Sequence, residues 1–177
     1  MGRSPLPKKH MQIHKLLGLS LATISIGAMA ALVEPDVDWK EVDVPPPPAF
    51  SRDKLIPLEM PAYVSLKFGV DPATLSVASD RVVRYVMVAT NASGSISAMY
   101  EGIRCSSNEF KTYARLGSSG QWNIVKDPQW RALDDNNISR HALALARQGG
   151  CDVRAAAPSS VADVISGLRN RKVTAGN

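Results

Sequence analysis

The stretch RVVRYVMVATNASGSISAMYEGIRC, residues 81–105, decides the fold of this chain. Residues 81–90 alternate with a period of two, and both faces of the alternation are apolar apart from Arg84. An extended segment that is apolar on both faces is typical of a central strand whose sheet is covered on both sides. The small and polar residues 91–95 favour a tight turn, so residues 96–105 should return antiparallel beside the first strand.

The returning strand contains a break in its alternation. Tyr100 belongs to the apolar face, whereas Ile103 falls on the opposite face unless Gly102 marks a β-bulge. With a bulge at that position, Glu101 and Arg104 share the wetter face. We therefore expect a candidate binding patch made of Tyr100, Glu101 and Arg104, with Arg84 as a further candidate member. The alternative is a simple strand-to-strand ion pair between Glu101 and Arg104, which would contribute less than about 1 kcal/mol if exposed.

Three further segments have the alternation of strands. They are residues 63–70 before the hairpin, and residues 109–116 and 121–125 after it, and short turns join the last two to the chain. Together with the hairpin they predict an antiparallel meander sheet of four to five strands with one face packed on another layer.

The C-terminal part has the apolar spacing of helices, so it should supply that second layer. An asparagine pair at 136 and 137 can cap a helix that ends at Gly149 and Gly150, and Ser160 can open a second helix. The predicted fold class is therefore α+β, with one or two C-terminal helices packed on one face of the sheet.

The N-terminal part divides into two segments before the globular domain. Residues 1–30 combine a basic start with an apolar run too short to span a bilayer, so they predict a secretory signal peptide. Residues 31–57 predict an extended, proline-rich arm, which either lies along the domain, anchored by Trp39 and Phe50, or serves as a ligand for a partner. A single domain over 58–172 and a frayed tail over 173–177 complete the chain.

The signal segment also accounts for the basic charge of the chain. The sequence has 21 Lys and Arg against 16 Asp and Glu, and the segment holds four of the basic residues, so 17 remain against 16. A nearly neutral domain does not predict a nucleic-acid partner. No later stretch is long and apolar enough to predict a membrane span after signal removal.

Cys105 and Cys151 are the two cysteines of the chain, and an exported domain meets an oxidising compartment. We therefore predict a single disulfide between them, which closes a loop of 46 positions and holds the fold together. The alternative is a reactive thiol at Cys105, which requires an imidazole base. His141, the histidine left after signal removal, could provide one if the fold brings it close.

In the order of several of its segments, the sequence resembles the CNP-one-like family of uncharacterised exported bacterial proteins, mainly from proteobacteria. The segments that carry the resemblance are DWKE (38–41), PPPPAF (45–50), GVDPATLSV (69–77), RVVRYVMVATNASGS (81–95), YEGIRC (100–105) and KTYARLGSSGQW (111–122). The resemblance implies an exported, periplasmic protein of unknown activity, and it supplies no catalytic residues. The last 27 residues, from Cys151 on, carry no part of it.

The sequence has none of the phosphate-loop, nucleophile-elbow, zinc-protease or dinucleotide motifs, so it predicts no catalytic residues, no metal and no cofactor. We expect a noncatalytic binding module of the cell envelope whose partner is an envelope protein or glycan. The alternatives are a small periplasmic hydrolase that uses Glu101 or Cys105, and a structural subunit of an envelope assembly. The sequence leaves the question of an enzyme and the oligomeric state open.

Overall fold

A computed structural model describes residues 1–2, 38–135, 140–152 and 156–170. From residue 38 on, the described residues belong to one compact unit, 34–177. The predicted signal peptide from residue 3 on, the first part of the predicted arm, the asparagine cap at 136 and 137, and the tail lie outside the described residues.

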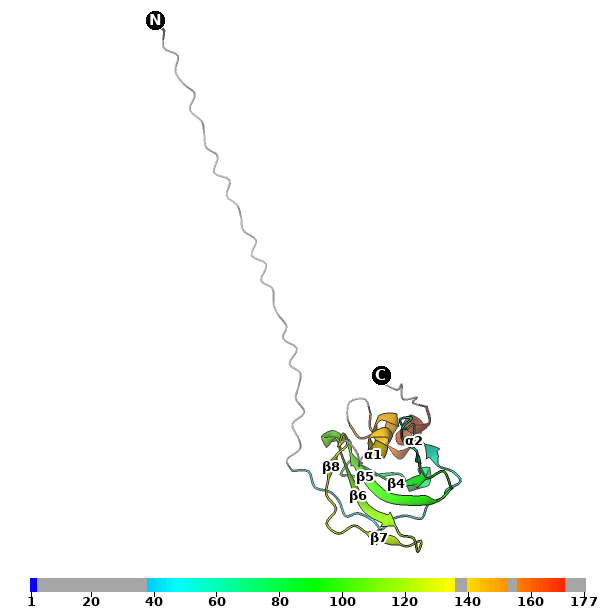
Figure 1. Ribbon diagram of the computed structural model, residues 1–177. Helices are drawn as coiled ribbons and strands as arrows, with labels where there is room; N and C mark the ends of the chain where they lie inside the picture. Colours follow the sequence, from blue (N-terminus) through cyan, green and yellow to red (C-terminus); the bar gives the residue numbers. More distant parts are fainter. Residues whose placement is uncertain (3–37, 136–139, 153–155, 171–177) are drawn as a thin grey trace. The chain divides into compact units, whose positions relative to one another are not determined.

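The described part contains one antiparallel sheet of eight strands and two α-helices (Figure 1). The strands are β1 (Ile56–Pro57), β2 (Lys67–Val70), β3 (Ser76–Val77), β4 (Val82–Thr90), β5 (Ile96–Arg104), β6 (Glu109–Leu116), β7 (Trp122–Ile124) and β8 (Arg131–Ala132), and the helices are α1 (Arg140–Leu145) and α2 (Val161–Asn170). The order is β1-β2-β4-β5-β6-β7, with β3 beside β4 and β8 beside β6. The α+β class is confirmed, but the predicted strand number of four to five is too small. The additional strands β1, β3 and β8 have two residues each, which is too short for a period to be visible in the sequence.

The hairpin of β4 and β5 forms the centre of the sheet, and its register runs unbroken from Val82 opposite Arg104 to Thr90 opposite Ile96. The bulge predicted at Gly102 is therefore wrong. The register instead shifts between β5 and β6, where Tyr113 is the extra residue between the partners of Tyr100 and Glu101. Because a bulge turns successive side chains of one strand toward the same face, Tyr113 and Ala114 pack into the same cluster.

The two faces of the sheet carry separate apolar clusters. We call the face covered by α1 and α2 the helix face; Figure 1 shows both helices on this side. Its buried core residues on the sheet include Val83, Tyr85, Met87, Ile103 and Phe110, and those on the helices include Ala142, Leu145, Val164 and Leu168. This arrangement confirms that the sheet packs its helices on one face.

The opposite face, which we call the arm face, is covered by residues 38–55. This segment contains no helix or strand. Its Val44, Phe50 and Leu55 pack against the second apolar cluster, and the ring of Phe50 meets Trp122 edge to face at 6.0 Å. Because a layer lies on each face, β4 is buried along nearly its whole length.

The C-terminal layer is fixed to the sheet by a disulfide and by a close backbone contact. Cys105 follows β5 directly and is bonded to Cys151, as predicted. Just before Cys151, Gly149 has a φ of 143° and lies so close to Gly167 of α2 that a Cβ atom there would be 2.5 Å from the Gly167 carbonyl carbon. Two glycines are therefore needed where α2 crosses this segment.

Helix α2 begins with the capping interactions that its sequence predicts. The Ser160 hydroxyl accepts a hydrogen bond from the Asp163 amide at 3.2 Å and donates to the Asp163 carboxylate at 2.8 Å.

Before α2, the side-chain amide of Gln148 bonds the segment at the edge strand β1. It donates to the Pro57 carbonyl and accepts from the Glu59 amide, both at 2.9 Å. Gln148 Nε2 also donates to the Leu168 carbonyl of α2 at 2.8 Å, so this one side chain ties the C-terminal layer to the edge of the sheet.

Candidate functional site

The four residues predicted to form a binding patch lie on both faces of the sheet. Arg84, Tyr100 and Arg104 point to the arm face, whereas Glu101 points to the helix face. The prediction that Glu101 and Arg104 share a face is wrong, because β5 has no bulge at Gly102 against β4. Arg84, Tyr100 and Glu101 are buried and Arg104 is half-buried, so a binding role for these side chains stays a prediction.

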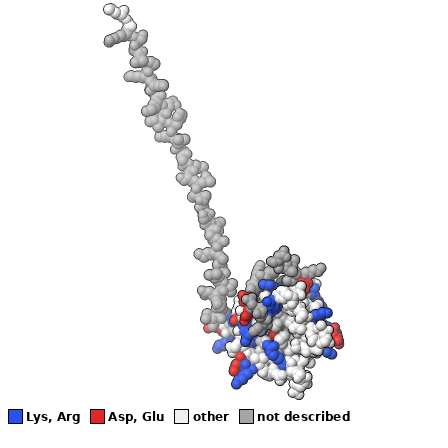
Figure 2. All heavy atoms as spheres, in the orientation of Figure 1, with Lys and Arg blue, Asp and Glu red and all other residues white. Residues whose placement is uncertain are grey.

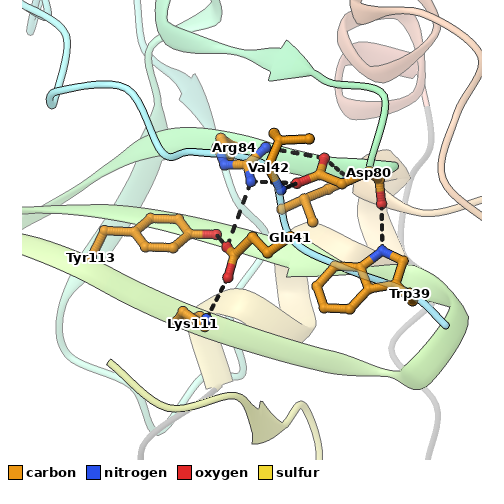
Figure 3. Close-up of polar contacts among 8 residues, drawn as sticks. Trp39, Glu41, Val42, Asp80, Arg84, Lys111 and Tyr113 are labelled. Atoms are coloured by element: carbon orange, nitrogen blue, oxygen red, sulfur yellow. Dashed lines mark hydrogen bonds and ion pairs between the residues drawn. The ribbon is translucent and has the colours of Figure 1, made fainter. Parts of the chain in front are cut away.

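On the arm face, Arg84 and Asp80 form a buried two-bond ion pair (Figure 3). Arg84 Nη1 donates to Asp80 Oδ1 at 3.2 Å and Nη2 donates to Oδ2 at 2.6 Å. Burial raises the pKa of Asp80, but the hydrogen bonds from Arg84 and from the Val82 and Val42 amides outweigh it, so the pKa lies below its usual value. The Val42 amide belongs to the arm, which connects the arm to this ion pair.

Glu41 of the arm enters the same cluster and bridges β4 and β6. Its Oε1 accepts a hydrogen bond from the Tyr113 hydroxyl at 2.6 Å, its Oε2 lies 2.5 Å from Lys111 Nζ, and Arg84 Nη2 is 3.5 Å from Oε1. Figure 3 shows the carboxylate turned toward these three side chains. Burial and the hydrogen bond to Glu41 raise the pKa of Tyr113 well above its usual value, so Tyr113 remains a donor.

Trp39 completes the attachment of the arm. Its indole Nε1 donates to the Asp80 carbonyl at 2.9 Å, and the Arg104 guanidinium lies 3.8 Å from the centre of its ring. Its ring also meets Trp130 edge to face at 5.8 Å. The arm-face cluster therefore holds residues 39–42 against the sheet. The Nε atoms of Arg84 and Arg104 have no hydrogen-bond partner among the described residues.

On the helix face, a second polar cluster surrounds Glu101. Its carboxylate is fully buried and accepts hydrogen bonds from Thr112 Oγ1 at 3.0 Å and from the Tyr85 hydroxyl at 3.3 Å. His141 Nε2 lies 2.9 Å from Glu101 Oε2. Burial and the nearby Glu101 carboxylate raise the pKa of Tyr85 well above its usual value, so Tyr85 is a permanent donor to it.

The Glu101 cluster is enclosed by aromatic rings. The imidazole of His141 stacks on Phe68 with ring centres 5.3 Å apart, and Phe110 meets it edge to face at 6.1 Å. A carboxylate that orients an imidazole is one part of a hydrolytic triad, but here the Glu101 carboxylate lies against His141 Nε2, the atom that serves the nucleophile in the serine-protease triad. Cys105 is bonded to Cys151 and His141 is paired with Glu101, so the two do not form a thiol–imidazole dyad.

A pocket lies at the outer edge of β6, which we call the β6 pocket. Strands β7 and β8 both pair with β6, and the segment between them leaves a cavity of about 360 Å³ next to the helix face. Its lining residues are Phe110, Thr112, Arg115, Val125, Lys126, Asp127, Pro128, Gln129 and Arg131. Arg115, Lys126 and Arg131 are exposed and form no ion pair with any described residue. The pocket therefore presents free basic groups beside apolar walls.

Within the described ranges, no group of three or more His, Cys, Asp and Glu side chains is placed to hold a metal ion. None of the helices in these ranges is both long and apolar enough to cross a bilayer.

Comparison with known protein families gives one match. The model of the CNP1-like family matches residues 34–169, which include the arm, the whole sheet and nearly all of α2. The chain belongs to the CNP1-like family. This is the CNP-one-like family that the sequence resembles, and the match extends beyond the quoted segments into α2. Searches among curated proteins and among solved structures found no match.

Sequence reasoning missed the partners of the buried charges in this CNP1-like chain. Glu41 is separated from Lys111 by 70 positions, and Glu101 from His141 by 40. No short-range pattern relates such residues. The available signal was the isolated Arg84 within an apolar strand, because a buried guanidinium requires a carboxylate from elsewhere in the chain.

Proposed function

We propose that this chain is a noncatalytic binding module of the cell envelope, located in the periplasm, that takes up its ligand in the β6 pocket. The signal-like sequence of residues 1–30 supports the location. The observation that carries the binding role is the set of free basic side chains around the cavity. Concave sites with apolar walls and a few polar groups are the usual form of small-ligand sites.

The position of the reactive groups favours a binding module over the hydrolase alternative. The thiols of Cys105 and Cys151 are joined, and the carboxylate of Glu101 is fully buried beneath Tyr85 and Thr112. The hydrolase alternative, which uses Glu101 or Cys105, would need one of these groups to touch its substrate. Thr112 lines the β6 pocket and donates a hydrogen bond to Glu101, so a ligand bound there would meet Thr112 rather than the buried Glu101 carboxylate.

The charges on the face shown in Figure 2 support a specific site rather than broad electrostatic binding. On the face shown in Figure 2, basic and acidic side chains are interspersed rather than gathered by sign. An extended polyanion such as nucleic acid would require a continuous basic surface. The free basic groups at one cavity instead favour a small partner or the end group of a larger one.

The test is an amide correlation NMR spectrum of the exported, processed protein, recorded with and without the small-molecule fraction of a periplasmic extract. We expect the amides of Val125, Gln129 and Arg131 to shift, because they lie at the β6 pocket. The amides of Ser93 and Gly94, in the turn between β4 and β5, are the internal control and should not shift. Recovery of a chemically unchanged ligand completes the expected result. Unchanged pocket amides, or conversion of the ligand, would contradict the proposal.

A further inference from the structure

We infer that the ligand of the β6 pocket is a small organic acid, meaning a molecule with a carboxylate or phosphate group on an apolar body. This inference rests on the proposed function and names the chemical class that the site would recognise. It follows from the charges, the apolar walls and the size of the cavity.

The side chains that line the cavity carry a net positive charge. Arg115, Lys126 and Arg131 line it together with one acidic residue, Asp127, and none of the three basic side chains is paired with a described carboxylate. Unpaired cations at a concave surface concentrate the field and attract an anion. Two of them are guanidinium groups, which bind carboxylate or phosphate oxygens through two parallel hydrogen bonds.

Arg115 is held at the pocket by a weak contact that a ligand oxygen can replace. Its Nη1 lies 3.2 Å from the Sδ atom of Met99 on the neighbouring strand β5. A thioether sulfur is a poor acceptor, whereas a charged oxygen is a strong one. The guanidinium is therefore positioned by the sheet without having its donors used by a carboxylate.

The walls and the volume require more than an inorganic ion. Phe110 is only 2% exposed and forms the apolar base, and the half-buried Val125 and Pro128 continue it. A cavity of about 360 Å³ is at the lower end of the range for small organic ligands and much larger than one phosphate ion. An apolar ligand body would bury the exposed parts of Val125 and Pro128, which water covers in the free protein.

The shape of the wall is set by a turn that begins at Asp127. This residue has a φ of 50°, and its carbonyl accepts a hydrogen bond from Gln129 Nε2 at 3.0 Å. Asp127 tolerates this left-handed conformation better than most residues, because its side chain is short and polar. The turn places Lys126 before, and Arg131 after, the residue that bears the one negative charge of the lining.

The test is a titration of the exported, processed protein with four probes, followed by the amide resonances of Val125 and Gln129. The probes are phenylacetate, phenyl phosphate, the neutral phenylacetamide and inorganic phosphate. We expect at least one of the two aromatic acids to saturate these shifts, with phenylacetamide and inorganic phosphate binding about tenfold more weakly or worse. The tighter of the two acids identifies the acidic group. Equal binding by inorganic phosphate, or by phenylacetamide, would overturn the assignment of an organic acid.

Charge variants test the role of the guanidinium groups. The Arg115→Gln and Arg131→Gln double variant should raise the Kd of the preferred acid by about tenfold or more. The matched control, Arg52→Gln with Lys67→Gln, removes the same charge from exposed positions outside the pocket and should leave the Kd unchanged. A Lys126→Gln variant serves if the double variant does not fold, which the dispersion of its spectrum reports. An equal loss in the control would show nonspecific attraction and overturn the inference.

The extract experiment separates this inference from the proposed function. If the extract ligand shifts the pocket amides of the wild type and of the double variant equally, the pocket binds a ligand of another class. In that case the inference fails and the proposed function stands. If neither the extract nor any probe shifts these amides, both fail.

Discussion

The imidazole Nε2 of His141 lies 2.9 Å from Oε2 of Glu101, and this contact joins helix α1 to the middle of strand β5. Three side chains from three elements converge on the same carboxylate: Tyr85, Thr112 and His141. The contact with His141 favours one arrangement of the layers, because a shift of the helix would remove the His141 partner of a buried carboxylate.

Replacement of this carboxylate should therefore destabilise the protein strongly. We expect Glu101→Ala to lower the free energy of unfolding by about 3 kcal/mol, because it leaves the side chains of Tyr85, Thr112 and His141 without their common partner. Urea denaturation measures the change. Glu101→Gln, which keeps an acceptor in place, should cost less. The control Asp53→Ala, at an exposed position of the arm, should stay within about 0.5 kcal/mol of the wild type. A loss at Glu101→Ala no larger than that of the control would contradict this role.

The stability should depend on pH through Asp80. Its pKa is about 3.9 in the unfolded chain and lower in the folded protein, so the folded state favours the charged form. The stabilisation is complete when the pH is above the pKa of Asp80 in the unfolded chain. It is lost as the pH falls through the lower pKa of Asp80 in the folded protein. Wild type should thus keep a constant advantage over Asp80→Asn from about pH 7 to 5 and lose it below about pH 4.

Urea midpoints of both proteins, measured across this range, check the expectation. Asp53→Asn should follow the wild-type curve, because its carboxylate is exposed. If the wild-type advantage over Asp80→Asn persisted unchanged to the lowest pH, Asp80 would not be the titrating group.

The disulfide should be complete in exported protein and should contribute to stability. A loop of 46 positions corresponds to about 4 kcal/mol in the chain-entropy account, so Cys105→Ser with Cys151→Ser should lower the free energy of unfolding by about 2–4 kcal/mol. Mass spectrometry after alkylation provides a second readout. Both thiols should be blocked until a reductant is added, and a labelled Cys105 without reductant would contradict the bridge.

The crossing of α2 over the preceding segment should tolerate no side chain at Gly149. In Gly149→Ala the new Cβ would lie 2.5 Å from Gly167, and the φ of 143° is also unfavourable for alanine. We expect a loss of about 3 kcal/mol or more in thermal or urea denaturation.

Gly94 separates these two effects. It also has a positive φ, of 81°, but a Cβ there would meet nothing within 4 Å. Gly94→Ala should therefore show the conformational cost alone, about 1 to 2 kcal/mol. Equal losses for the two variants would mean that the close contact with Gly167 is unimportant.

The central strands could be predicted because their alternation is long and local. Residues 82–90 are apolar on both faces, and the turn residues after them fix the antiparallel return. The bulge was misplaced because Tyr100 and Ile103 were expected to share one apolar face, whereas they belong to apolar clusters on opposite faces. The burial of Glu101 could not be seen locally either, because its partner His141 comes 40 positions later. Tyr113, the residue actually bulged, has a side chain that suits either face, which hides the shift.

The candidate site depended still less on local sequence. The β6 pocket exists because β7 and β8 pair with different halves of β6, and β8 is only two residues long. The positions of Arg115, Lys126 and Arg131 in the sequence follow no recognisable binding motif. Only the pairing of the strands brings them around one cavity.

The amide of Gln148 has a consequence for association between molecules. An unprotected outer strand offers free carbonyl and amide groups to which a second chain can add its own strand. Beside β1 the Pro57 carbonyl and the Glu59 amide are already engaged by Gln148, so an incoming strand would have to displace a buried side chain to bond there. Gln148 therefore disfavours the addition of further chains to the sheet at the β1 edge, and with it the formation of fibres.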